Sequence, residues 1–293
     1  MSERRPANGV VIVDKPGGVT SFDVVASVRR ALGEKRVGHT GTLDPMATGV
    51  LPICVGEATK LVPFLMGGDK EYEAELLFGV TTDSLDATGT VTSETNAAHV
   101  SRSDVERALP GFVGTIQQRP PMHSAVRVDG QRLYKLAHQG LEIERQERAV
   151  VVHALELLGF ATPRARLRVR CGKGTYVRSL AADLGAALGV GAHLTALRRT
   201  RVGPFTLEHA VALDTLSPAT PLMTPADALA DHATVPLDDA QVRDVRAGKV
   251  RTIETLRAPD GAGSHVRLLD PHGTLVAVAE AHAGRLTLAR VFC

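Results

Sequence analysis

Apolar and polar positions follow strand-like patterns in several segments of the chain. A short apolar run from Val10 to Val13 leads into turn-forming residues 14–18, and together they predict a strand that enters a loop. From Tyr72 to Phe78 apolar residues alternate with glutamates, which predicts a strand with one buried face. The largely apolar segment from Val150 to Phe160 predicts a well buried strand.

Helical patterns lie between these segments. Thr20 and Asp23 stand at the spacing of a capping box, an apolar stripe at helical spacing follows them, and Gly33 supplies a stop. Ser103 and Glu106 repeat the capping-box spacing before a short helix that a Pro-Gly pair closes. We therefore expect helices after residue 20 and after residue 103.

The clearest alternation in the chain carries arginines. An arginine occupies every second position from Arg164 to Arg170, and apolar residues fill the positions between. Because successive side chains of a strand point to opposite faces, four arginines share one face. This face is either a solvated surface or a contact for a polyanion, and the pattern alone leaves both readings open.

Strands and helices are mixed without a strict alternation. We therefore expect an α+β fold with a mixed, largely antiparallel sheet and flanking helices. Residues from about 213 to 236 are rich in Pro, Thr, Ala and Asp, which is typical of a connection between domains. We expect a large domain over residues 1–230 and a small β-rich domain over 231–293, with a short helix over 241–248 and strands over 266–270, 274–280 and 286–292.

Charge and composition narrow the possible partners. The formal net charge is only +2, so any site for a polyanion must be local. From Pro163 to Arg201 nine Lys and Arg residues face a single acidic residue, Asp183, which gives this segment a net charge of +8. The chain has no Trp and only three Tyr, which counts against a row of rings that stacks on a long single strand. No run of 18 apolar residues occurs and the start of the sequence shows no apolar h-region, so we expect no membrane span and no export. The three Cys residues are far apart and form no C-x-x-C motif, which fits a reducing, cytoplasmic location.

Several chemistries find no support in the spacing of reactive residues. The eleven His residues never come closer than seven positions apart, so we expect no metal site. The segment Gly172 to Thr175 lacks the first glycine and the hydroxyl of a P-loop, which excludes nucleotide hydrolysis of that type. Cys171 falls on the apolar phase of its strand, where it is a core residue rather than a nucleophile. We expect no cofactor.

One loop concentrates residues with special backbone requirements. Residues 38–52 contain glycines and two prolines around a single carboxylate, Asp44. Either Asp44 and the following proline only start a turn, or the loop presents a functional carboxylate. The residues of the loop alone do not decide between these readings.

Longer stretches are similar to one known family. The segment GHTGTLDPMATGVLPICVGEATKL resembles the catalytic segment of the TruB family of tRNA pseudouridine synthases. The resemblance continues in the expected order through VDKPGGVTS, KEYEAELLFGVTTDSLDATG, QRPPMHSAVRVDGQRLYKLA, CGKGTYVRSLAADLG and GAHLTALRRTRVGPF. Near the end of the chain, VRLLDPHGTLVAVAE resembles a PUA-type RNA-binding module. One departure is Gly172, where the family commonly has Ser, and it puts only the local loop conformation in doubt.

The resemblance implies the pseudouridine synthase fold and an isomerase, an intramolecular transferase that converts the uridine at position 55 of the tRNA T-loop into pseudouridine. Asp44 then matches the nucleophile, which attacks either the ribose C1′ or the uracil C6, and no cofactor is needed. Arg178 matches the arginine that pairs with it, and Tyr72 matches the residue that stacks on the uracil and moves its C5 proton. Without the resemblance, Arg178 would read as a surface arginine at a helix start, and Tyr72 as a core residue.

The resemblance also implies how the target base is reached. The uridine must leave its stack, and His39 matches the residue that fills the vacancy. Tyr176 and Leu197 match positions of the substrate pocket, for which core packing is the other reading. Lys15, Lys60 and the arginine strand are expected either to contact the RNA backbone or to support the structure. The binding should weaken steeply with salt.

The expected partner is the T-arm of tRNA, with no membrane and no obligatory protein partner. We expect a monomeric, stand-alone enzyme of the bacterial type with a PUA-like C-terminal domain. One competing hypothesis is a tRNA-binding protein that folds tRNA without catalysis. Another is the same isomerisation on a different RNA.

Overall fold

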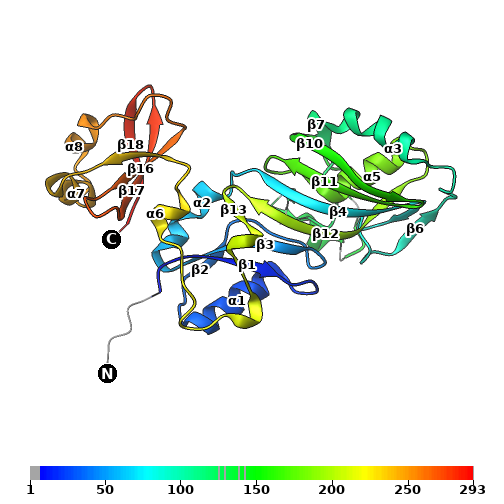
Figure 1. The fold of residues 1–293 in the computed structure, drawn as a ribbon, viewed down its shortest axis with the longest axis horizontal. Coiled ribbons are helices and arrows are strands. Elements are labelled where there is room, and N and C mark those ends of the chain that lie inside the picture. The colour runs from blue at the N-terminus through cyan, green and yellow to red at the C-terminus, as the bar shows by residue number, and fades with distance from the viewer. Residues whose placement is uncertain (1–6, 125, 129, 138, 142, 293) are drawn as a thin grey trace.

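The molecule is elongated, with the C-terminal module at one end and the large sheet extending to the other (Figure 1). The computed structural model describes residues 7–124, 126–128, 130–137, 139–141 and 143–292. Within these ranges no helix is both long and apolar enough to cross a membrane.

The core of the large domain is a mixed sheet. Its strand order is β14-β1-β3-β12-β4-β11-β10-β7, with β2 paired to β3 and β13 paired to β12. The pairs β1–β14 and β12–β3 are parallel and the other pairs are antiparallel, which confirms the predicted sheet. The strands are β1 (Gly9–Lys15), β2 (Val37–His39), β3 (Thr48–Val55), β4 (Lys70–Phe78), β7 (Gly114–Gln118), β10 (Arg148–Ala161), β11 (Arg164–Cys171), β12 (Ala192–Val202), β13 (Phe205–Thr206) and β14 (Ala210–Ala212).

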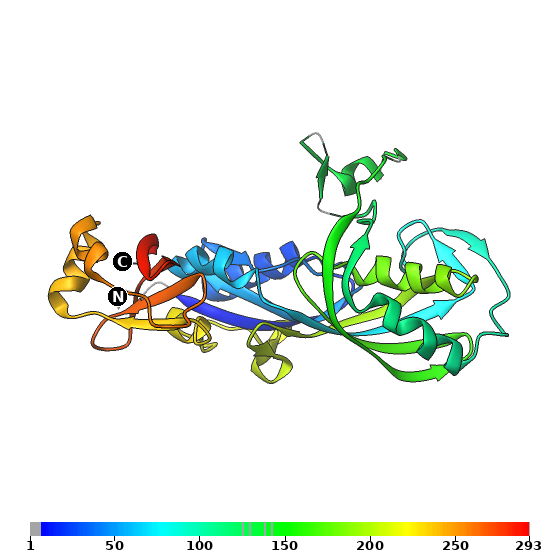
Figure 2. The same ribbon diagram turned by 90° about the horizontal axis from the view of Figure 1, so that it is seen from above.

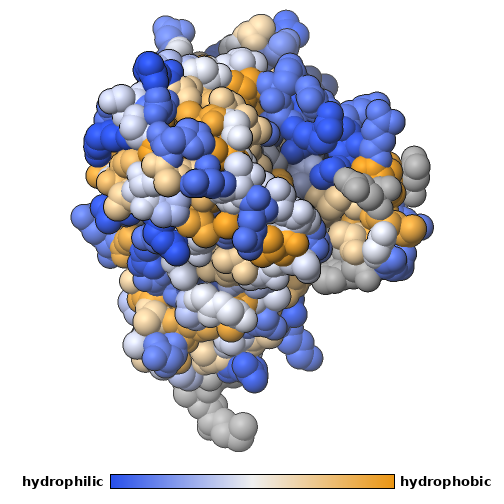
Figure 3. Space-filling view, turned by 90° about the vertical axis from the view of Figure 1, so that its right-hand side faces the viewer, coloured by the Kyte–Doolittle hydropathy of each residue, from blue (hydrophilic) through white to orange (hydrophobic). Residues whose placement is uncertain are grey.

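Helices α1 (Ser21–Leu32) and α5 (Val177–Ala187) lie on the same side of this sheet, and the chain between β7 and β10 projects from that side as an arm (Figure 2). In the space-filling view the arm stands away from the body of the domain, with hydrophilic side chains along the hollow between them (Figure 3). The remaining short elements are α2 (Val62–Leu65), β5 (Val80–Thr82), β6 (Val91–Glu94), α3 (Arg102–Ala108), β8 (Arg127–Val128), β9 (Gln131–Arg132), α4 (Leu133–Ala137) and α6 (Pro225–Ala228).

The helix signals in the sequence are correct for α1 and displaced for α3. Thr20 and Asp23 form the predicted capping box of α1, and Gly33 ends it at a φ of 67°. Helix α3 begins two residues earlier than predicted, because Ser101 and Asp104 form its capping box instead of Ser103 and Glu106. Both pairs have the same spacing, and the spacing alone could not distinguish them.

The two faces of the sheet differ in character. Apolar residues of β4 and β11 are buried against α5, while the arginines of β11 lie on the opposite face. The prediction of a well buried strand is wrong for β10, of whose residues only Val150 and Val152 are buried. Strand β7 pairs only with residues 148–152 of β10, so the rest of β10 lies at the edge of the sheet and much of its surface is exposed.

The C-terminal module is built on a second sheet, in the order β15-β16-β17-β18. Its strands are β15 (Ala233–Pro236), β16 (His265–Leu269), β17 (Leu275–His282) and β18 (Arg285–Val291), and its helices are α7 (Asp239–Arg246) and α8 (Val250–Thr255). The predicted helix and the three predicted strands are therefore present. Leu275, Val278 and Phe292 pack in one cluster with Val10 and Leu61 of the large domain, so the module is docked through buried apolar side chains.

Candidate active site

The loop that carries Asp44 runs from β2 to β3 and is fixed from several sides. The predicted loop of residues 38–52 is shorter in the structure, because β2 extends to His39 and β3 begins at Thr48. The Ser21 hydroxyl at the start of α1 donates to the carbonyl of Leu43 at 3.1 Å and accepts from the Leu43 amide at 2.9 Å. These bonds tie the start of α1 to the residue before Asp44.

Lys15 is hydrogen-bonded to the same loop. Its side chain is fully buried, and its Nζ donates to the carbonyls of Pro16, Pro45 and Ala47 at 3.0, 3.1 and 2.7 Å. Burial lowers the pKa of Lys15 from 10.5 to about 8. Of the two readings for Lys15, RNA contact or structural support, the geometry favours support.

Asp44 and Arg178 face each other at the centre of the site. Nε of Arg178, at the start of α5, lies 2.9 Å from Oδ2 of Asp44. The Asp44 side chain is 32% exposed, whereas that of Arg178 is 4% exposed, so the carboxylate is the accessible member of the pair. Burial raises the pKa of Asp44, and the guanidinium beside it opposes this shift. The arginine therefore favours the ionised form that a nucleophile requires.

Arg178 is itself anchored by a second carboxylate that the sequence did not single out. Nη1 of Arg178 lies 3.4 Å from Oδ2 of Asp86, whose side chain is 5% exposed. The same guanidinium donates to the carbonyl of Ser84 at 2.9 Å and to that of His123 at 2.7 Å. These three contacts fix the orientation of the group that faces Asp44.

Asp86 sits in a tight, hydrogen-bonded turn. Its Oδ1 accepts from the Ser84 hydroxyl at 2.8 Å, from the Thr88 amide at 3.0 Å and from the Thr88 hydroxyl at 2.6 Å. Leu85 between them has a φ of 63°, an unfavourable backbone conformation for a residue with a side chain. The spacing Ser-x-Asp-x-Thr is the signal from which this turn could have been found.

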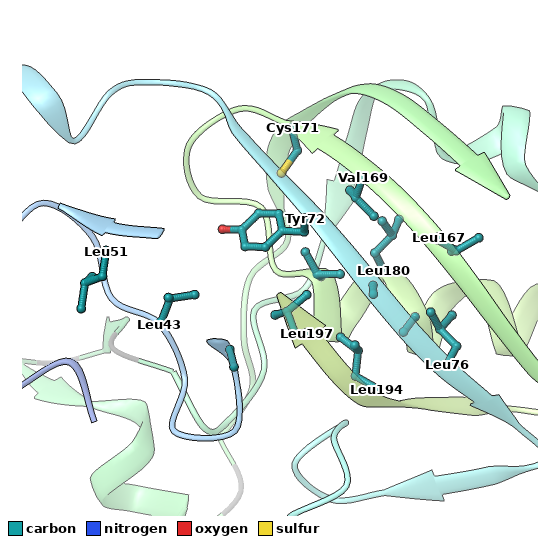
Figure 4. Close-up of a cluster of buried hydrophobic side chains, with 14 of the residues drawn as sticks. Leu43, Leu51, Tyr72, Leu76, Leu167, Val169, Cys171, Leu180, Leu194 and Leu197 are labelled. Carbon is teal, nitrogen blue, oxygen red and sulfur yellow. The ribbon is translucent and has the colours of Figure 1, made fainter. Parts of the chain in front are cut away.

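Tyr72 and Leu197 lie on the face of the sheet that carries α5. Tyr72 is 7% exposed, and its ring packs with Val169 and Leu197. Figure 4 shows its hydroxyl turned away from the leucines of β11 and α5, toward the side on which Leu43 and Leu51 lie. The core reading and the site reading are therefore compatible, since the ring is packed while the hydroxyl faces the Asp44 loop.

Tyr176 precedes α5 and is clamped by one glutamine. The Gln118 side chain accepts from the Tyr176 amide at 2.7 Å and donates to its carbonyl at 3.1 Å. Burial raises the pKa of Tyr176. The sequence had put the local conformation at Gly172 in doubt. In the structure the Gly172 amide donates to the Val151 carbonyl at 2.9 Å, so the loop before Tyr176 is held in place.

His39 lies at the end of β2, half-buried beside an exposed ring. Its imidazole meets Phe22 edge to face, with ring centroids 5.5 Å apart, and Phe22 is 64% exposed. Burial lowers the pKa of His39, which keeps the imidazole neutral at neutral pH. Asp44, Arg178, Tyr72, Leu197, Tyr176 and His39 thus come from five separate segments to one side of the sheet.

The arginine strand does not join this group. Val169 of β11 pairs directly with Tyr72 of β4 and shares its face, so the arginines at alternate positions point away from the site. They lie beside the glutamates of β4, and Arg168 pairs with Glu156 at 2.8 Å. Much of the segment's charge of +8 is therefore on the back of the sheet, beside acidic neighbours.

Lys60 has a contact in the C-terminal module. Its Nζ donates to the carbonyl of Val291 at 3.0 Å and lies 5.7 Å from the centre of the Phe292 ring. It also pairs with Glu57. These contacts give Lys60 a supporting role between the large domain and the module.

Two family models match this chain. "TruB family pseudouridylate synthase (N terminal domain)" matches residues 29–177, and "tRNA pseudouridylate synthase B C-terminal domain" matches residues 178–240. The chain belongs to the TruB family. As a TruB family member it is an isomerase that forms pseudouridine, and the predicted resemblance is confirmed.

Relatives and solved structures agree with this assignment. Proteins called tRNA pseudouridine synthase B from Symbiobacterium thermophilum and Burkholderia mallei are 54% and 46% identical to it, covering 78% and 98% of both chains. A crystal structure of a Cbf5-Nop10-Gar1 complex contains a chain that is 28% identical, with a TM-score of 0.73, 97% of this chain covered and 85% of that one. A structure of an H/ACA RNP bound to a substrate RNA gives a TM-score of 0.74 at 26% identity, with the same coverage. The predicted pseudouridine synthase fold is confirmed.

The described part of this TruB family member shows no group of three His, Cys, Asp or Glu side chains that could hold a metal ion.

Proposed function

We propose that this TruB family enzyme converts the uridine at position 55 of the tRNA T-loop into pseudouridine, with Asp44 as the nucleophile. The observation that carries the proposal is the ion pair between a partly exposed Asp44 and a buried Arg178, with the Tyr72 hydroxyl on the same side of the sheet. Relatives at 46–54% identity carry the name tRNA pseudouridine synthase B, which supports tRNA as the substrate.

The reaction rearranges one nucleotide without a second substrate. The bond between C1′ and N1 breaks, a bond between C1′ and C5 forms, a proton leaves C5 and a proton is added to N1. The ionised Asp44 attacks C1′ or C6 and is released at the end, so that electrons and atoms balance. Arg178 keeps Asp44 ionised, and Tyr72 stacks on the uracil and is placed to move the C5 proton.

The remaining site residues are proposed to hold the flipped base. Tyr176 and Leu197 line the pocket for the uracil, and His39 fills the vacancy in the T-loop. His39 is suited to this role because its neutral imidazole and the exposed Phe22 present apolar surface beside the Asp44 loop. We further propose that residues 231–293 form a PUA-like domain that contacts the RNA and that the enzyme acts as a monomer without a protein partner.

The substrate proposal is tested with the purified chain alone. T-arm RNA carrying tritium at uracil C5 is incubated with the enzyme, and the released tritium is counted. We expect release from the T-arm and none from an RNA in which position 55 is cytidine and tritium is confined to the other uridines. Binding of both RNAs without release from either would contradict the proposal and favour a non-catalytic tRNA-binding protein. Release only from RNAs that lack a T-loop would favour the same isomerisation on another RNA.

A further inference from the structure

Arg199 of β12 is a fully buried arginine in contact with both arms of the Asp44 loop. Its Nε donates to the carbonyl of Val50 at 2.8 Å, after Asp44 in the chain. Its Nη2 and Nη1 donate to the carbonyls of Gly41 and Thr42, before Asp44, at 3.2 and 3.4 Å. One side chain with an exposure of 1% thus connects the beginning and the end of the loop.

Burial of this cation is energetically unfavourable, so its presence here calls for an explanation. A buried guanidinium is normally paired with a carboxylate, because its desolvation costs several kcal/mol. Among the described residues, no ion pair joins Arg199 to an Asp or Glu, and its acceptors are neutral oxygens. A smaller apolar side chain at the centre of the domain would avoid this cost.

The remaining contact of Arg199 leads to Tyr72. The two residues are directly opposite each other on the paired strands β12 and β4, and their side chains lie on the same face. The guanidinium lies close enough to the Tyr72 hydroxyl to act on its pKa. Because a guanidinium has donors but no acceptor, the phenolic oxygen is the acceptor in any bond between the two groups, and the phenolic proton is left to point elsewhere.

We propose that Arg199 is a positioning residue with two roles. It donates to the oxygen of Tyr72, so that the phenolic O–H is directed at the substrate, and it fixes the Asp44 loop. The inference deepens the proposed function and rests on it. Tyr72 is the group that meets the uracil, and Arg199 acts through it. The consequence falls on the step in which the proton leaves C5.

The positive charge of Arg199 also acts electrostatically on the Tyr72 hydroxyl. Burial raises the pKa of Tyr72, and Arg199 works against that shift. Asp44 raises the pKa of Tyr72 further, and Cys171 acts in the same direction. Arg199 is therefore the group that keeps proton transfer at the Tyr72 oxygen accessible.

The test compares Arg199→Lys with Arg198→Lys, the same change at the next residue. Arg198 pairs with Asp14 at 2.7 Å and is 40% exposed, so this control keeps a charge and perturbs a surface pair. Single turnovers are measured on T-arm RNA with hydrogen or deuterium at C5. We expect Arg199→Lys to slow turnover by about 10- to 100-fold and to raise the deuterium isotope effect above the wild-type value. Arg198→Lys should change neither quantity. An Arg199→Lys enzyme with a slower turnover but an unchanged isotope effect would overturn the link to Tyr72 and leave a merely structural residue.

A double-mutant cycle separates action through Tyr72 from independent damage. If Arg199 acts through the hydroxyl, Arg199→Lys combined with Tyr72→Phe is no slower than Tyr72→Phe alone. If the double variant is instead slowed by the product of the two single-variant factors, the inference is overturned. If Arg199→Lys does not fold, thermal unfolding of Tyr72→Phe tests the contact instead. Loss of the Tyr72 hydroxyl leaves a guanidinium N–H unpaired, which should lower the melting temperature by about 2 °C or more. An unchanged melting temperature would overturn the inference. Absence of tritium release by the wild type would instead contradict the proposed function.

Discussion

Two arginines on the back of the sheet, Arg166 and Arg170, are expected to have no part in tRNA binding. Both are exposed, and both lie on the face opposite to Tyr72. Two other cations lie near Tyr176: Arg148 is opposite Gln118, which clamps Tyr176, and Lys173 is exposed in the loop before Tyr176. Replacing each pair by glutamine removes the same charge, from the back of the sheet in one case and from the surroundings of Tyr176 in the other.

The expected magnitudes follow from counterion release. Each cation that contacts a phosphate contributes about 0.7 to 0.9 to the slope of log affinity against log salt. Loss of the two contacts near Tyr176 should lower the slope by about 1.5, which reduces the fall in affinity between ~50 and ~200 mM salt by about eightfold. Loss of the two back-face arginines should leave the slope unchanged.

The assay is a fluorescence titration of labelled T-arm RNA at several salt concentrations, with thermal unfolding to confirm that both double variants are folded. A similar loss of slope in Arg166→Gln/Arg170→Gln and in Arg148→Gln/Lys173→Gln would refute the reasoning. It would mean that the RNA reaches around the sheet to the arginine face.

Three further predictions concern the site and its loop. Asp86→Asn should lower the single-turnover rate by about tenfold or more, because Arg178 loses the carboxylate that orients it. Asp86 also raises the pKa of Asp44, so the acid limb of the pH–rate profile should move to lower pH in this variant. A shift of that limb to higher pH would contradict the assigned sign. Gly49→Ala should lower stability by about 1–3 kcal/mol or more, because Gly49 has a φ of 104° and a Cβ there would lie 2.1 Å from a strand carbonyl oxygen; Gly67→Ala, with open space around it, is the control in thermal unfolding. Because the pKa of Lys15 falls from 10.5 to about 8 on folding, its contribution to stability should rise as the pH increases from about 8 to about 10.5, and Lys15→Met should remove that rise in chemical denaturation curves measured across this window.

Local patterns in the sequence predicted those elements whose signals are local. The capping box of Thr20 and Asp23 is in place, and so is the strand from Tyr72 to Phe78 with its single buried face. The end of the Asp44 loop was placed too late and the start of α3 was misplaced by two residues, since strand pairing and a competing Ser-Asp pair set those boundaries. Boundaries depend on partners that a linear pattern does not contain.

The site was predicted only in part for the same reason. Asp44, Tyr72 and Arg178 were named by their resemblance to a family, and the structure brings them to one side of the sheet. Asp86 and Arg199 were missed because their importance comes from contacts across the fold, with Arg178 in one case and with the Asp44 loop in the other. The two readings of the arginine strand, RNA contact or structural support, could not be separated from the sequence, because it shows the charge but not which way the sheet faces.

The most direct test of the account is tritium release by Asp44→Asn under single-turnover conditions, beside the wild type. The substitution keeps the shape of the side chain and removes the charge that Arg178 faces. We predict no release above background at any enzyme concentration, with the affinity for T-arm RNA within about twofold of wild type because backbone contacts carry the binding. Release at the wild-type rate by the folded variant would contradict Asp44 as the nucleophile, and with it the central claim about this site.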